Sequence, residues 1–122
     1  MKKVMAIVLA MLLVLSAAAM AETVKIGVLE PASGDSGAGG KQEMLGMQFA
    51  NVETPTVEIG GTTYDVELVY ADNGSSTDKA PSAAQQLVSE GVSVVLGSYG
   101  SGVSIAGSEY FKNANIPVIG LT

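Results

Sequence analysis

Ser101 is the residue whose type and surroundings most favour binding chemistry. It stands in the glycine-rich run 97–102, directly before a predicted helix. The start of a helix presents free backbone N–H groups and the positive end of the helix dipole, so it favours an anion, and the Ser101 hydroxyl adds a further donor. Ser101 or Ser98 could equally cap its own helix, and capping preference alone does not separate these two roles.

The sequence contains partial matches to enzymatic and nucleotide-binding motifs, but each match lacks a residue that the motif requires. A hydrolase nucleophile elbow around Ser101 would need glycine where Tyr99 stands, and the chain has no histidine to activate the hydroxyl. A phosphate-binding loop would need glycine at Asp35 and serine or threonine at Gln42. Gln42 also breaks a dinucleotide-binding pattern, and the run 72–74 predicts a turn because the later acidic ligands of a calcium loop are missing. The sequence therefore argues against catalysis.

Composition excludes further classes of function. The chain has no cysteine and no histidine, so zinc or haem ligation through these side chains is excluded, and we expect neither a cofactor nor a bound metal. Residues 22–122 carry four lysines and no arginine against twelve aspartates and glutamates. Such an acidic surface lacks the groups that neutralise phosphates, so a nucleic-acid partner is not expected.

Residues 1–21 have the pattern of a cleavable signal peptide. Lys2 and Lys3 precede the apolar stretch 4–15, and Ala19-Met20-Ala21 supplies the cleavage pattern that leaves Glu22 as the mature N-terminus. A membrane anchor is the alternative, although the apolar core is short and ends in alanines. Because there is no cysteine, a lipid anchor is excluded. We expect a periplasmic or otherwise extracytoplasmic protein without stable membrane insertion after cleavage.

The first half of the mature chain predicts strands around one helix. Gly60-Gly61 marks a two-residue hairpin between two β-rich runs. The expected elements are a strand at 24–29, a loop at 30–40, a helix at 41–52, and strands at 57–59 and 62–70, followed by a turn at 71–76.

The second half continues the alternation of helices and strands. A helix from Thr77 or Asp78 to Glu90 is stopped by Gly91, and is followed by a strand at 92–96, a loop at 97–102, a helix at 103–113 and a strand at 116–119. This order predicts an α/β fold, a doubly wound parallel sheet with an inserted β-hairpin. If the four main strands lie in the order 2-1-3-4, the glycine-rich loops 30–40 and 97–102 flank the switch point where such folds bind ligands.

The mature sequence resembles the first part of the type I periplasmic binding proteins. Within that family it is most similar to the branched-chain amino-acid (leucine/isoleucine/valine-type) substrate-binding proteins of ABC transporters. The resemblance covers the whole mature chain, and it rests on five segments in this order behind the signal peptide: 24–34, 68–73, 83–88, 94–101 and 116–120.

The resemblance implies a site and a larger architecture. Such proteins are two-lobed and longer than this chain, so we expect residues 22–122 to be the N-terminal, incomplete part of the first lobe of a leucine-binding-protein-like domain. Ser101, with the neighbouring amides at Gly100 and Gly102, corresponds to the group that holds the ligand's α-carboxylate. Thr122 corresponds to the residue whose carbonyl meets the α-ammonium group. Tyr99 completes the candidate set.

The function expected from these observations is binding without catalysis. The resemblance implies the extracytoplasmic solute-binding component of an ABC importer, with an amino acid as ligand and a transporter permease as partner. An amide, urea or another small polar ligand is the alternative on the same scaffold, and the aromatic residue that some members place against the ligand corresponds to Gly39 here. An exported flavodoxin-like or hydrolytic domain is a further alternative, because many functions share doubly wound folds.

Overall fold

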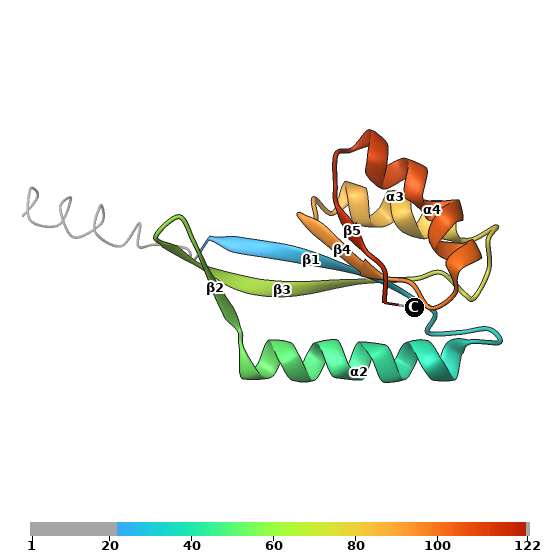
Figure 1. Cartoon of the computed structure of the whole chain (residues 1–122), viewed down its shortest axis with the longest axis horizontal. Coiled ribbons are helices and arrows are strands. Elements are labelled where there is room, and N and C mark those ends of the chain that lie inside the picture. The colour runs from blue at the N-terminus through green and yellow to red at the C-terminus, as the bar shows by residue number, and fades with distance from the viewer. Residues whose placement is uncertain (1–21, 122) are drawn as a thin grey trace, which may run out of the picture.

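The computed structural model describes residues 22–121, so the predicted signal peptide at 1–21 and Thr122 lie outside the described residues. The described chain forms a sheet with helices on both faces (Figure 1). Its elements are β1 (Thr23–Glu30), α2 (Gly37–Glu53), β2 (Thr56–Ile59), β3 (Thr62–Asp72), α3 (Ala80–Ser89), β4 (Val94–Gly97), α4 (Ser101–Asn113) and β5 (Val118–Ile119).

The sheet confirms the predicted α/β topology. Its strand order is β2-β3-β1-β4-β5, in which the four main strands are parallel and take the order 2-1-3-4 on which the expected switch point depended. β2 pairs with β3 in the antiparallel direction across the predicted hairpin. Glu30 is in register with Asp72, and Leu29 with Gly97. The carboxyl ends of β1, β3 and β4 therefore meet at one edge of the sheet.

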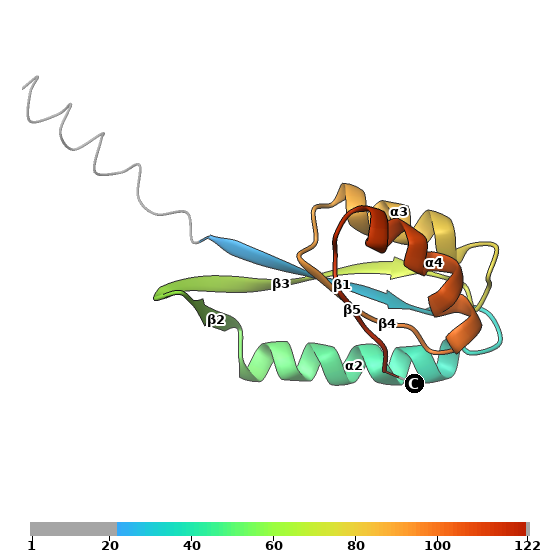
Figure 2. The ribbon, with the colours of Figure 1, turned by 45° about the horizontal axis from the view of Figure 1, so that its top comes forward.

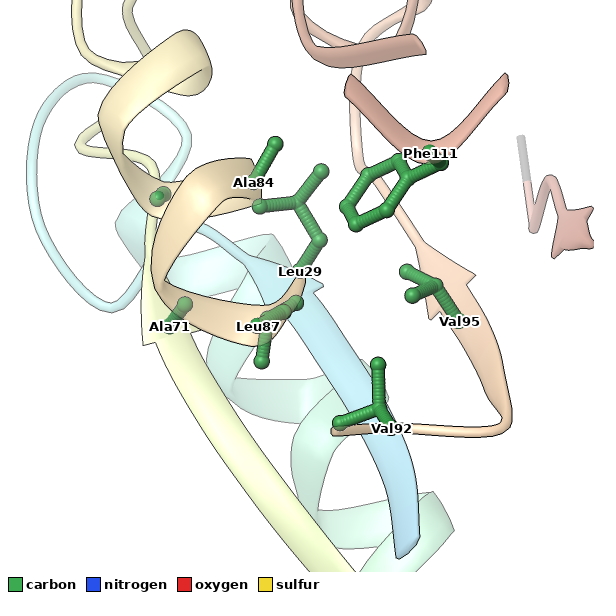
Figure 3. Packing of buried hydrophobic residues seen from close by; sticks show 8 residues of the cluster. Leu29, Ala71, Ala84, Leu87, Val92, Val95 and Phe111 are labelled. Atoms are coloured by element: carbon green, nitrogen blue, oxygen red, sulfur yellow. The ribbon is translucent and has the colours of Figure 1, made fainter. Parts of the chain in front are cut away.

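The two faces of the sheet are covered unequally. α3 and α4 lie together on one face and α2 lies alone on the other (Figure 2). The core lies under α3 and α4, where Leu29 and Val95 of the sheet meet Leu87 and Phe111 of the helices (Figure 3). Between α2 and the other face there is a cavity of 640 Å³, lined mainly by apolar side chains that include Ile26 and Leu96.

Two helices begin earlier than the sequence predicted. The run 30–40 was expected to be a loop, but α2 begins within it, at Gly37. That prediction was wrong because packing outweighs the low helix propensity of glycine. Gly40 is buried against Pro31, where a side chain would not fit. α4 likewise begins at Ser101 rather than at 103, directly after Gly100 with its φ of 103°.

Candidate functional site

The carboxyl edge of the sheet is held together by side chains from the β3–α3 turn. Asp72 Oδ1 accepts hydrogen bonds from the Ala32 and Gly74 amides at 2.8 Å each, and Oδ2 accepts one from the Ser33 hydroxyl at 2.7 Å. Asn73 is fully buried, and its side-chain amide donates to the Leu29 carbonyl at 3.3 Å. The turn therefore fixes the loop that leads from β1 into α2.

Ser75 completes this connection. Its hydroxyl donates to the Ser33 carbonyl at 2.9 Å and accepts a hydrogen bond from the Ser36 amide at 2.9 Å. The sequence predicted a turn at 71–76 and gave it no further role. Its function as a clamp on a loop about 40 residues away was missed, because a hydrogen bond over such a separation leaves no local pattern.

The second loop at this edge connects β4 to α4. Gly97 has a φ of 119° and the Gly97–Ser98 peptide bond is cis. A Cβ atom on Gly97 would overlap the Leu29 carbonyl oxygen, so only glycine fits where this loop passes β1. Ser98 is buried, and its amide donates to the Ser104 hydroxyl at 3.1 Å. The loop is thus anchored both to β1 and to the first turn of α4.

Ser101 is the first residue of α4 and is exposed to solvent. Gly100, which has no side chain, occupies the N-cap position. Within residues 22–121, neither the hydroxyl of Ser101 nor the amides of Ser101 and Gly102 donate a hydrogen bond. It is Ser104 whose hydroxyl contacts the Gly100 carbonyl, at 3.4 Å. Ser101 is therefore not used as the cap of its own helix.

Tyr99 lies beside this helix start and faces α2. Tyr99 is 39% exposed. A Cβ atom on Gly39 would lie 2.8 Å from Tyr99 Cε2, so the tyrosine ring occupies the space that a side chain at position 39 would need. The fold thus brings Tyr99, Gly100, Ser101 and Gly102 together, while the fifth predicted site residue, Thr122, lies outside the described residues.

Glu30 is a residue of this edge that the sequence analysis missed. It ends β1 and is only 1% exposed, and its Oε2 accepts the Tyr99 amide at 2.8 Å. Burial raises the pKa of Glu30 to about 7; the hydrogen bond from Tyr99 opposes this rise, and a hydrogen bond and like charge from Glu43 of α2 add to it. One signal was present in the sequence. Residues alternate between faces along a strand, so Glu30 follows Ile26 and Val28 on the side that faces α2.

Residues 22–121 contain no group of three or more acidic, histidine or cysteine side chains arranged to hold a metal ion. None of the helices in the same range combines the length and apolar character needed to cross a bilayer.

The family of the chain follows from comparison with known proteins. The model of the family described as "Periplasmic binding protein" matches residues 23–122. The chain belongs to the periplasmic binding protein family. Its sheet and helices match one lobe of the type I architecture in this family, as the sequence predicted.

Curated and solved members of the periplasmic binding protein family resemble the chain over most of its length. A Leu/Ile/Val-binding protein homolog 6 from Brucella abortus (strain 2308) is 33% identical over 121 residues, which are 98% of this chain and 30% of that protein. The structure of a leucine binding protein from Thermotoga maritima MSB8 is 32% identical, with a TM-score of 0.73 over 80% of this chain and 27% of that one.

The solved structures that resemble the chain include complexes with ligands. A branched-chain amino acid transporter substrate binding protein from Streptococcus pneumoniae, in complex with isoleucine, is 32% identical, with a TM-score of 0.70 over 81% of this chain and 28% of that one. A solute binding protein from R. palustris in complex with 4-hydroxybenzoate is 28% identical, with a TM-score of 0.71 over 83% of this chain and 27% of that one. The chain thus spans under a third of the length of these proteins.

Proposed function

We propose that this chain is part of the solute-binding component of an ABC importer for a branched-chain amino acid. Residues 22–122 form an incomplete first lobe of the ligand-binding domain, act outside the cytoplasm after removal of residues 1–21, and deliver ligand to a transporter permease. The family match supports this proposal, as do relatives named for leucine, isoleucine and valine binding and the neighbour that holds isoleucine.

The start of α4 is the proposed contact for the ligand's α-carboxylate. The observation that carries this assignment is the set of unused donors there: the Ser101 hydroxyl and the amides of Ser101 and Gly102. Donors at a helix start act together with the helix dipole, which favours negative charge. The exposed Tyr99 ring stands beside this position and offers an apolar and aromatic surface to the ligand. The carbonyl of Thr122 is proposed to meet the α-ammonium group.

The site is proposed to bind without catalysis. A serine becomes a nucleophile when a neighbouring base removes its proton, and the whole sequence contains no histidine to do so. The family and the structural neighbours are solute-binding proteins. Both points argue against the alternatives of an exported hydrolytic or flavodoxin-like domain.

A different small ligand is the second candidate on the same scaffold. An amide, urea or another small polar molecule could use the same donors, and a solved neighbour holds 4-hydroxybenzoate, an aromatic acid. Amino acids and aromatic acids share a carboxylate and differ in the rest of the molecule. The start of α4 would therefore receive the carboxylate of either ligand, and residues elsewhere would select between them.

Replacement of Ser101 tests the carboxylate contact. In the complete gene product, Ser101→Ala should weaken amino-acid binding roughly tenfold to a hundredfold, because a hydrogen bond to a charged group contributes about 1.5 to 3 kcal/mol. Calorimetry with an amino acid and with its carboxamide measures this effect. The loss should be large for the acid and small for the amide, which carries no negative charge on that group.

Ser108→Ala is the matched control, because Ser108 is an exposed serine of the same helix whose hydroxyl bonds the Ile105 carbonyl at 2.8 Å. Its affinity should equal that of the wild type. Equal losses for acid and amide in Ser101→Ala, or no loss for either, would refute the carboxylate assignment.

A further inference from the structure

We infer that Glu30 is a positioning residue for the loop between β4 and α4, and that the protonation of its buried carboxyl group, next to Glu43, controls this role. No comparison or sequence pattern assigns either glutamate a role. The effect on the loop concerns the described chain by itself, whereas the effect on ligand affinity rests on the proposed function.

The Glu30 side chain contacts the loop between β4 and α4. Its side chain is 1% exposed, and its Oε2 holds the Tyr99 amide at 2.8 Å. Its Oε1 lies against the loop as well, since a Cβ atom on Gly97 would stand 2.6 Å from it. A change in the charge of the Glu30 carboxyl group therefore acts on Gly97 and on Tyr99, both in the segment that leads to Ser101.

Glu43 of α2 is the carboxyl group next to Glu30. It lies about two turns into α2, on the side that faces the sheet, and lines the cavity there. Glu30 Oε1 and Glu43 Oε2 are both buried, and neither accepts a hydrogen bond from a donor group in the described chain. A buried carboxylate oxygen that no donor satisfies is unfavourable when the group is ionised, so these two neighbouring oxygens favour a proton on Glu30.

The other charged and titratable groups near Glu30 do not supply a hydrogen-bond donor to its unpaired oxygen, Oε1. Asp72 of β3 is its register neighbour, but the Asp72 carboxylate already accepts hydrogen bonds from backbone amides and a serine. Lys79, before α3, lies over the turn that follows β3. Tyr99 contributes its amide, which favours the ionised form, while burial and then Glu43 favour the protonated form and set the pKa of Glu30 near 7.

Loss of the proton from Glu30 adds a negative charge beside Tyr99, close to the site proposed for an anion. Ser101 is two residues from Tyr99, at most about 7.6 Å between Cα atoms. Repulsion over such distances in a partly buried site weakens binding of a carboxylate several-fold, up to about tenfold. Affinity for the ligand acid is therefore high below pH 7, where Glu30 is protonated, and falls as the pH rises through about 7.

The first experiment follows the Tyr99 amide by NMR in the ¹⁵N-labelled chain, with no ligand present. In the wild type, its chemical shift should titrate with a midpoint near pH 7. Glu30→Gln keeps an oxygen that accepts the Tyr99 amide and removes the titrating group, so this transition should disappear. Glu43→Gln removes the like charge and leaves burial, so the midpoint should move to lower pH. Glu53→Gln, an exposed glutamate in the same helix, should match the wild type.

Two results would overturn the inference. The first is a Tyr99 amide in the wild type that does not titrate across the neutral range, as expected if Glu30 were a purely structural residue. The second is a Glu43→Gln midpoint that equals that of the wild type. Both measurements need only the wild type or the Glu43 variant, so they stand even if Glu30→Gln does not fold.

The second experiment measures amino-acid affinity across the neutral pH range in the complete gene product. The wild type should lose affinity several-fold as the pH rises through about 7, and Glu30→Gln should bind equally at all these values. Binding that is independent of pH in the wild type would overturn the effect on affinity and leave the proposed function intact. A titrating Tyr99 amide in a protein that binds no carboxylate would refute the proposed function and uphold the role of Glu30 in the loop.

Discussion

Asp72 shows how one side chain can hold the candidate site in shape. It joins the end of β3 to the loop after β1 through the Ala32 and Gly74 amides and the Ser33 hydroxyl. Its slight burial would raise the pKa of this carboxyl, but the hydrogen bonds outweigh burial and hold the pKa below its ordinary value. The folded chain therefore binds this proton less readily than the unfolded chain, so Asp72 stabilises the fold at neutral pH and loses this effect as the pH falls through its folded pKa.

Asp72→Ala should lower the free energy of unfolding by about 1 to 2 kcal/mol at about pH 7, the modest size reflecting an exposed side chain. The difference from the wild type should shrink below about pH 4, where the carboxyl becomes protonated. Urea unfolding at about pH 7 and at about pH 2.5 measures both values. Asp35→Ala, an exposed aspartate of the β1–α2 loop, should stay within about 0.5 kcal/mol of the wild type. A difference that is undiminished in acid would contradict the assignment.

Single residues were predictable where local pattern carries the information. Ser101 stands between two glycines just before the helix predicted at 103–113, and this spacing placed it near the start of α4, which begins at Ser101 itself. Glu30 and Ser75 act on segments 69 and about 40 residues away, respectively. Their partners are set by strand register and loop packing, which no short stretch of sequence encodes.

At the scale of elements, the parallel sheet was predictable and the start of α2 was not. Alternating strands and helices permit few parallel arrangements, and the order 2-1-3-4 assumed for the switch point is the one that the fold adopts. The glycines before Lys41 predicted a loop, yet three of them lie in the first turn or so of α2. Gly40 is needed there because the helix passes directly over Pro31, and this contact is visible only in the folded chain.

Gly40→Ala and Gly46→Ala in α2 should change stability in opposite directions. A Cβ atom on Gly40 would lie 2.7 Å from Pro31 Cδ and would overlap the Pro31 carbonyl oxygen. The cost of this overpacking, about 1 to 3 kcal/mol, exceeds the gain of at most about 1 kcal/mol in helix propensity, so Gly40→Ala should destabilise the chain. A Cβ atom on Gly46 would have no atom within 4 Å, so Gly46→Ala should stabilise it by up to about 1 kcal/mol. Denaturant unfolding compares the free energies of unfolding of the two variants. A Gly40→Ala variant more stable than the wild type would contradict this prediction, because it would mean that Pro31 moves aside at little cost.

On the scale of the whole molecule, the described chain is a sheet that is well covered on one face only. Beneath α3 and α4 the side chains form a closed core, whereas α2 spans a cavity of 640 Å³ and carries Leu45, Phe49 and Val52 exposed by 64%, 69% and 75%. The candidate site is likewise open to solvent on one side. Ser101 and Tyr99 are exposed, so a ligand at the start of α4 would meet protein on one side and solvent on the other.

The 122-residue chain should therefore bind a branched-chain amino acid only weakly. Ligand sites normally bury most of the surface of their ligand, and the donors proposed at the start of α4 would contact only its carboxylate. The dissociation constant for leucine should lie near or above about 1 mM, corresponding to about 4 kcal/mol of binding free energy. Calorimetry should show no measurable micromolar binding, while high leucine concentrations should shift the NMR signals of the Ser101 and Gly102 amides, and Ser101→Ala should reduce those shifts. Micromolar affinity in the isolated chain would mean that it encloses the ligand by itself, and that the open site described here is not the complete site.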